Sequence, residues 1–208
     1  MPVNKRRRST VTRQRLGVKD TVLARMVPNL RMRHAPRGAH ALYTQTMSAR
    51  KQARLLAQGS HAPSFHLKLL DGGDAKLEEI LARGPAVLAF FKVSCPVCQL
   101  TFPFLERIHA AGGLPVYGVS QNDAKDTRGF NQDFGVTFPT LLDAEKQGFP
   151  ASNAYGISSV PTLFRIEPDG TVSHVIEGWN RKEMESMGTK AGASVFRQGE
   201  NVPEWKAG

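Results

Sequence analysis

The stretch Phe90-Phe91-Lys92-Val93-Ser94-Cys95-Pro96-Val97-Cys98 decides the fold of this 208-residue chain. It begins in the continuous apolar run 86–91, which is typical of a central β-strand covered on both faces. Two cysteines follow directly, and a helical pattern extends over 95–111. The sequence therefore predicts a dithiol at the carboxyl end of a central strand, where a helix begins. Open α/β sheets place their functional sites at such junctions.

This position predicts a different role for each cysteine. Unpaired N–H groups and the macrodipole at a helix N-terminus stabilise a thiolate on Cys95. Pro96 suits the first turn because its missing N–H would have no partner within the helix. Cys98 lies one turn further along, where it is close enough to form a disulfide with Cys95 and is less exposed. We expect Cys95 to attack a substrate disulfide as the nucleophile and Cys98 to act as the resolving thiol.

The patterns around this stretch alternate between strands and helices. Strands are expected at 65–69, 86–91, 115–120, 140–143, 161–166 and 171–176. Helices are expected at 76–82, 95–111, 123–134, 144–155 and 181–190. The last two strands form a hairpin across Asp169-Gly170, a strong turn signal. The order predicts an α/β fold with a mixed central sheet flanked by helices.

Charge divides the chain into two parts. Residues 1–58 hold 14 Lys and Arg and one acid, a net charge of +13, whereas residues 59–208 hold 14 basic and 17 acidic residues, a net charge of −3. Residues 1–46 lack a sustained apolar periodicity, so we expect a basic disordered tail. Other interpretations are a translation start at Met47, a mitochondrial-type targeting peptide or a nucleic-acid-binding tail. The mildly acidic remainder argues against nucleic-acid binding by the domain itself.

The remaining boundaries and the location follow from the same patterns. We expect a lead-in over 47–62, the α/β domain over 63–192 and a C-terminal tail over 193–208. No apolar run approaches the ~18 residues of a transmembrane helix. The opening residues do not resemble a secretory signal. These observations predict a cytoplasmic protein whose dithiol is reduced at rest.

The cysteine count excludes several classes of protein. Two cysteines cannot form a disulfide framework or a four-cysteine zinc site, and histidines paired at zinc-finger spacing are missing. His66, His109 and His174 are expected to be surface or packing residues. We expect no metal, nucleotide or flavin, because the redox-active group is the Cys95–Cys98 pair itself.

Three motifs resemble the thioredoxin superfamily over residues 59–190. They are Cys95-Pro96-Val97-Cys98 after Phe90-Phe91, the helix proline of Phe102-Pro103, and Gly156-Ile157-Ser158-Ser159-Val160-Pro161-Thr162. The resemblance is to the redoxin branch, which includes the alkyl-hydroperoxide-reductase/thiol-specific-antioxidant (AhpC/TSA) group and the cytochrome-maturation thioredoxins. It implies that the Val160–Pro161 peptide is cis and faces the dithiol. Val160 and Pro161 would then bind an extended substrate segment, beside Pro96 and Val97.

The sequence also departs from these relatives. Ala89 replaces the buried aspartate of thioredoxin, so the proton acceptor for Cys98 is not identified. Ser94 replaces the usual tryptophan, and Thr101 replaces a glutamate of the cytochrome-maturation proteins. If Cys98 is aligned with the peroxidatic cysteine of peroxiredoxins, Phe91 and Cys95 stand where that family has Pro and Thr. Weak peroxidase activity at best is therefore expected.

The sequence thus predicts a thiol–disulfide oxidoreductase that acts on protein or small-molecule disulfides, with a role in cell redox homeostasis. Electrons would come from a partner reductase or a low-molecular-weight thiol. Two alternatives stay open. One is a thiol-dependent peroxidase with an antioxidant role, and the other is a non-enzymatic redox sensor or adaptor whose basic tail binds an acidic partner.

Overall fold

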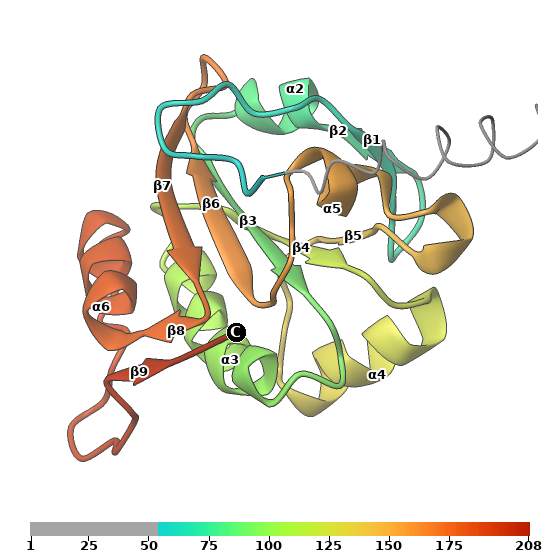
Figure 1. Ribbon diagram of the computed structural model, residues 1–208. Helices are drawn as coiled ribbons and strands as arrows, with labels where there is room; N and C mark the ends of the chain where they lie inside the picture. Colours follow the sequence, from blue (N-terminus) through green and yellow to red (C-terminus); the bar gives the residue numbers. More distant parts are fainter. Residues whose placement is uncertain (1–53) are drawn as a thin grey trace, which may run out of the picture. The chain divides into compact units, whose positions relative to one another are not determined.

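A computed structural model of the protein describes residues 54–208 (Figure 1). The basic segment 1–46 and the alternative start at Met47 lie outside the described residues. A seven-stranded sheet has the strand order β2-β1-β5-β4-β3-β6-β7. These strands are β1 (His66–Leu69), β2 (Asp74–Lys76), β3 (Ala86–Phe91), β4 (Val116–Ser120), β5 (Thr140–Leu142), β6 (Thr162–Ile166) and β7 (Val172–Glu177). A separate two-stranded ladder joins β8 (Trp179–Asn180) to β9 (Trp205–Lys206).

The sheet is mixed, and β3 lies in its interior. β3 pairs with β4 in parallel and with β6 in the antiparallel sense. All six residues of β3 are buried, which fits its unbroken apolar sequence. The predicted thioredoxin-like α/β fold with a mixed sheet is confirmed.

Helices cover both faces of this sheet. They are α2 (Leu77–Leu81), α3 (Pro96–Ala110), α4 (Ala124–Asp133), α5 (Pro150–Ala154) and α6 (Arg181–Lys190), with a short 3₁₀ turn at Glu145–Gln147. Figure 1 shows α3, α4 and α6 away from α2 and α5, which lie across the sheet. Buried side chains of α3, α4 and α6 form one core, and those of α2 and α5 form another. None of these helices is long and apolar enough to cross a membrane.

Alternate residues of β3 supply both cores. Phe91 packs on Phe102 of α3, with ring centroids 4.3 Å apart, and on Phe130 of α4 at 4.9 Å. On the other face, the ring centroid of Phe90 lies 5.1 Å from that of Tyr155 and 5.7 Å from that of Phe164. Aromatic rings therefore pack on both faces of the carboxyl end of β3, where the dithiol loop begins.

The segment 193–208 differs from the expected tail, because it packs against the domain. Val195 is 3% exposed, and the Arg107 guanidinium donates to its carbonyl at 2.7 Å and to both Glu200 oxygens at 2.7 Å. This hydrogen-bonded guanidinium lowers the pKa of Glu200 to about 2. The indole N–H of buried Trp179 donates to the Pro203 carbonyl at 2.6 Å. Such isolated anchors give no periodic pattern in the sequence, which is why a tail was predicted.

The start of the domain also lies earlier than expected. Within the lead-in, Leu56 N–H donates to the Tyr155 carbonyl at 3.0 Å and Gly59 N–H to the Val172 carbonyl at 2.8 Å. The single helix expected over 144–155 is instead a 3₁₀ turn and α5, separated at Gly148, whose φ is +72°. A left-handed residue at that point ends one helical turn before the next begins.

Asp143 is the buried carboxylate that fixes α5 to the end of β5, and α5 leads into the loop that carries Val160. It accepts hydrogen bonds from Ala151 N–H at 3.0 Å and Ser152 N–H at 2.7 Å, and it is 0% exposed. Replacing Asp143 with Ala leaves both N–H groups without this acceptor, so we expect a loss of about 1–3 kcal/mol in the free energy of unfolding. Urea denaturation measures it.

Asp133→Ala is the matched control, since Asp133 is an exposed carboxylate at the end of α4. We expect this control to change stability by less than about 0.5 kcal/mol. Equal stability losses in the two variants would contradict the anchoring role of Asp143.

Candidate active site

Cys95 is the N-cap residue of α3. Its φ of −83° and ψ of 116° are extended, and Pro96 takes the first helical position. The Cys98 backbone N–H donates to Cys95 Sγ at 3.3 Å. The cysteine sulfur therefore occupies the place where a serine or aspartate oxygen normally caps a helix. An N–H donor and the helix dipole both favour negative charge on that sulfur.

The loop before Cys95 is held from both sides by amide side chains. Val93 N–H donates to Asn122 Oδ1 at 3.1 Å, and Gln99 Nε2 donates to the Val93 carbonyl at 3.0 Å. Asn122 stands just after β4, the strand parallel to β3, so both strand ends contribute to the loop. Neither Asn122 nor Gln99 is predicted from the sequence to belong to the site. The position of Asn122 after a buried parallel strand was the available signal.

Cys98 lies one helical turn further in and is 0% exposed. Burial raises the pKa of its thiol strongly, and a hydrogen bond with the Cys95 side chain acts in the same direction. Cys95 is partly exposed, and both cysteines are free thiols. The helix thus places a reachable sulfur at its cap and a protonated, shielded sulfur one turn away.

The Val160–Pro161 loop meets the dithiol from across the sheet. Its peptide bond is cis, the isomer that the resemblance implies. The Cys95 thiol donates to the Val160 carbonyl at 3.2 Å, although the two residues are 65 positions apart in sequence. Val160 is half-buried and Pro161 is buried. The structure therefore brings together Cys95, Cys98 and the proposed substrate platform.

Pro96 and Val97 form the outer surface of the first turn. Pro96 is exposed and Val97 is half-buried. The Val97 carbonyl accepts a hydrogen bond from Thr101 Oγ1 at 2.7 Å. Thr101 is fully buried, so the residue that replaces the family's glutamate braces the first turn of the helix instead of facing a substrate.

The three histidines that were expected to be structural lie in separate places. His66 is 3.6 Å from Asp74 and His174 is 2.8 Å from Glu183, in two different surface pairs. His109 Nδ1 accepts from Val116 N–H at 3.1 Å. Within residues 54–208, no group of three His, Cys, Asp or Glu side chains is placed to hold a metal ion.

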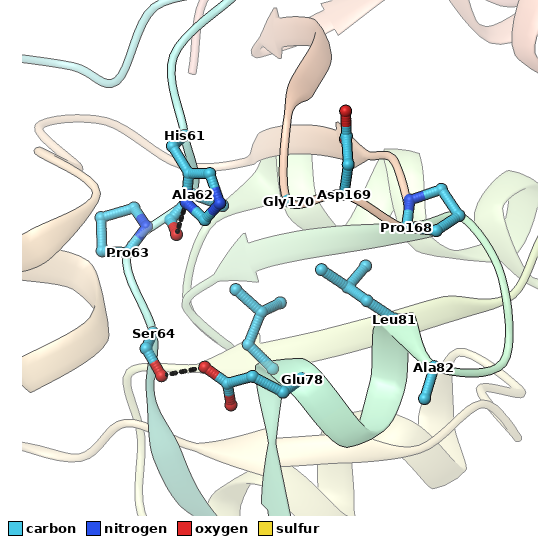
Figure 2. A pocket seen from close by; sticks show the side chains of 11 residues that line it. His61, Ala62, Pro63, Ser64, Glu78, Leu81, Ala82, Pro168, Asp169 and Gly170 are labelled. Carbon is cyan, nitrogen blue, oxygen red and sulfur yellow. Dashed lines mark hydrogen bonds between the residues drawn. The ribbon is translucent and has the colours of Figure 1, made fainter.

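A pocket of about 530 Å³ lies away from the dithiol, between the lead-in, α2 and the β6–β7 turn (Figure 2). Leu77, Leu81 and Pro168 contribute apolar surface, and Glu78 accepts a hydrogen bond from Ser64 at its edge. Neither cysteine lines it. The dithiol lies elsewhere, at the start of α3.

Comparisons with known proteins agree with this geometry. Thiol-disulfide oxidoreductase ResA of Geobacillus thermodenitrificans (strain NG80-2) is 32% identical over 132 residues, which cover 62% of this chain and 74% of the relative. Thioredoxin-like protein YneN of Bacillus subtilis (strain 168) is 32% identical over 138 residues, which cover 62% of this chain and 78% of the relative.

Solved structures show the same fold. The DsbF structure from Mycobacterium tuberculosis superposes with a TM-score of 0.54 at 27% identity, covering 62% of this chain and 98% of that one. The thioredoxin domain of a thiol-disulfide oxidoreductase from Bacteroides vulgatus gives a TM-score of 0.58 at 20% identity, covering 65% and 97%.

The fold and the dithiol at the start of α3 define a thioredoxin-like thiol–disulfide oxidoreductase. A family model described as the AhpC/TSA family matches residues 58–175. This chain belongs to the AhpC/TSA family.

The buried Cys98 thiol gives the reduced protein a characteristic pH dependence. In the unfolded chain a cysteine has a pKa of about 8.5. Since the folded pKa is higher, the unfolded state loses this proton first, and stability falls as the pH rises above about 8.5. We expect this group to lower the free energy of unfolding by up to about 1.4 kcal/mol per pH unit there. Denaturant unfolding between about pH 7 and pH 10 measures the slope.

The Cys98→Ala variant should lose this part of the slope, because it has no thiol to ionise at that position. Both proteins are kept reduced throughout, so that no disulfide contributes. The same alkaline slope in the variant would show that the burial of Cys98 is not its cause.

Proposed function

We propose that the protein exchanges its Cys95–Cys98 dithiol with disulfides of protein or small-molecule substrates, with Cys95 as the nucleophile. The contact of Cys95 Sγ with the Val160 carbonyl carries this proposal, because it places the partly exposed sulfur against the loop at which a substrate segment would pair. The names of the related proteins support the class of reaction.

The reaction proceeds in two exchanges. The Cys95 thiolate attacks one sulfur of the substrate disulfide, and a Cys95–substrate disulfide forms while the other substrate sulfur leaves as a thiolate. Cys98 then loses its proton and attacks Cys95 Sγ, and the second substrate thiolate is released. Two electrons pass from the dithiol to the substrate, and the protein is left with a Cys95–Cys98 disulfide. The reverse sequence oxidises a dithiol substrate.

The residues around the site divide this work. The Cys98 N–H donates to Cys95 Sγ, so it stabilises the thiolate before attack and, in the reverse direction, when Cys95 leaves the mixed disulfide. Asn122 and Gln99 hold the preceding loop at Val93, which fixes the direction of the sulfur. Ala89 is fully buried behind the dithiol, so the proton of Cys98 is not passed to a carboxylate at that position.

The peroxidase alternative is disfavoured by the burial of Cys98. A peroxidatic thiol must meet peroxide as a thiolate, whereas Cys98 is 0% exposed and its pKa is raised. The thiol that solvent reaches is Cys95, which has no neighbouring Thr or Arg at the peroxiredoxin spacing.

Trapping separates the roles of the two cysteines. Cys98→Ser should accumulate a Cys95–substrate disulfide with insulin, because the first exchange proceeds and the second has no attacking thiol. Cys95→Ser should lower the rate of disulfide reduction by at least about a thousandfold. Mass spectrometry of the non-reduced adduct identifies the linked cysteine. An adduct on Cys98 in the Cys95→Ser variant would reverse the assignment.

Removal of the basic segment tests whether disulfide exchange depends on it. Removal of residues 1–46 should leave the rate of disulfide reduction unchanged within about twofold, because the described contacts of the dithiol all lie within residues 91–208. Insulin turbidity with a chemical reductant gives the rate. A large loss of activity would show that the basic segment belongs to the catalytic unit.

Reduction by a partner reductase or a low-molecular-weight thiol, a role in cell redox homeostasis, and a cytoplasmic location complete the proposal. A reducing compartment would keep such a pair ready to donate electrons. Cell fractionation of the full chain tests the location, and recovery only outside the cytoplasm would overturn this part.

A further inference from the structure

Residues 205–208, called the strap below, pass over a buried glycine at the edge of the site. Gly178 directly follows β7, and its N–H donates to the Pro161 carbonyl at 2.7 Å. A Cβ on Gly178 would lie 2.3 Å from the Lys206 carbonyl oxygen and 2.7 Å from Gly208 N. Only glycine therefore permits the strap to approach the cis-proline loop so closely.

The strap reaches the carbonyl that contacts the nucleophile. A Cβ on Gly208 would lie 3.0 Å from the Val160 oxygen, and this oxygen accepts the Cys95 thiol hydrogen bond. A Cβ is about 1.5 Å from its Cα, so the Gly208 Cα lies within about 4.5 Å of the Val160 oxygen. Figure 1 shows the end marked C beside the start of β6. The strap thus occupies space beside Val160 that a pairing substrate strand would need.

The strap is held less firmly than the segment before it. Its four residues are all exposed, and it pairs with β8 through Trp179↔Lys206 and Asn180↔Trp205. The preceding residues are anchored by the Pro203 carbonyl, which accepts from buried Trp179, and by the Glu204 carbonyl, which accepts from Arg181 N–H at 2.9 Å. The strap can therefore leave while residues 193–204 stay in place.

We propose that the strap is a displaceable cover over the substrate-pairing edge at Val160 and that it selects the class of disulfide that reacts. The inference rests on the proposed function of the dithiol. A small disulfide reaches the partly exposed Cys95 sulfur with the strap in place. An extended protein segment has to displace the strap before it pairs with Val160. The intact chain therefore prefers low-molecular-weight disulfides.

The test compares the rates of oxidation of the reduced protein by glutathione disulfide and by insulin. A chain that ends at Glu204 lacks the strap and keeps the Pro203 and Glu204 carbonyls that anchor the rest. We expect its rate with insulin to rise about tenfold. In the intact chain, the few exposed contacts between the strap and β8 lower the rate by about that factor, because they must break before insulin pairs with Val160. Its rate with glutathione disulfide should change by less than about twofold.

Gly178→Ala should displace the strap from Val160 in the full-length chain. The added methyl group would overlap the Lys206 carbonyl, so the strap should lift and the rate with insulin should rise. Gly192→Ala is the matched control, since Gly192 has a φ of +73°, against +72° for Gly178, and has nothing within 4 Å of the added Cβ. We expect the control to keep the insulin-to-glutathione rate ratio of the intact chain.

The outcomes separate the cover from the dithiol chemistry. An unchanged rate ratio in the chain that ends at Glu204 overturns the cover and leaves the proposed function standing. Exchange with neither disulfide, in the intact and the shortened chain alike, overturns the proposed function and the cover with it. If Gly178→Ala does not fold, the shortened chain decides alone.

Discussion

The geometry of the site depends on one sulfur held between two backbone groups. Cys95 Sγ accepts from the Cys98 N–H at 3.3 Å and donates to the Val160 carbonyl at 3.2 Å. The first contact defines where α3 begins, and the second joins the helix to a loop 65 residues later in the chain. Cys95 Sγ thus contacts both the first turn of α3 and the Val160–Pro161 loop. The packing of Phe91 on Phe102 and Phe130 limits how far α3 can shift relative to the end of β3.

Unequal surroundings give two identical side chains different chemistry. The pair is separated by one turn of a helix, which is enough to place one sulfur at the boundary with solvent and the other in the core. Burial disfavours the charged form of Cys98, whereas Cys95 is partly exposed and accepts a hydrogen bond from a backbone N–H. Depth along one helix therefore distinguishes the partly exposed cysteine from the buried one.

The sequence predicted those parts of the structure that depend on local periodicity. Ala86–Phe91 and Arg181–Lys190 have the predicted bounds because each has an unbroken pattern that ends at a clear boundary. The segment after Lys190 was missed because its anchors, such as Val195 and the Pro203 carbonyl, are single contacts made across long distances in sequence. Asn122 was missed for the same reason. Its partner Val93 is 29 residues away, so the position of Asn122 after a buried strand indicates the site but not this hydrogen bond.

The contrast between the two tryptophans of the chain has an optical consequence. Trp179 is completely shielded beside Phe104 and Phe196, while Trp205 is 61% exposed. Their indoles should emit at different wavelengths, with the shielded ring shifted to the blue and the exposed ring open to aqueous quenchers. The native chain therefore contains an intrinsic pair of fluorophores, one reporting on the packing around α3 and the other on the outer ladder, without any attached dye.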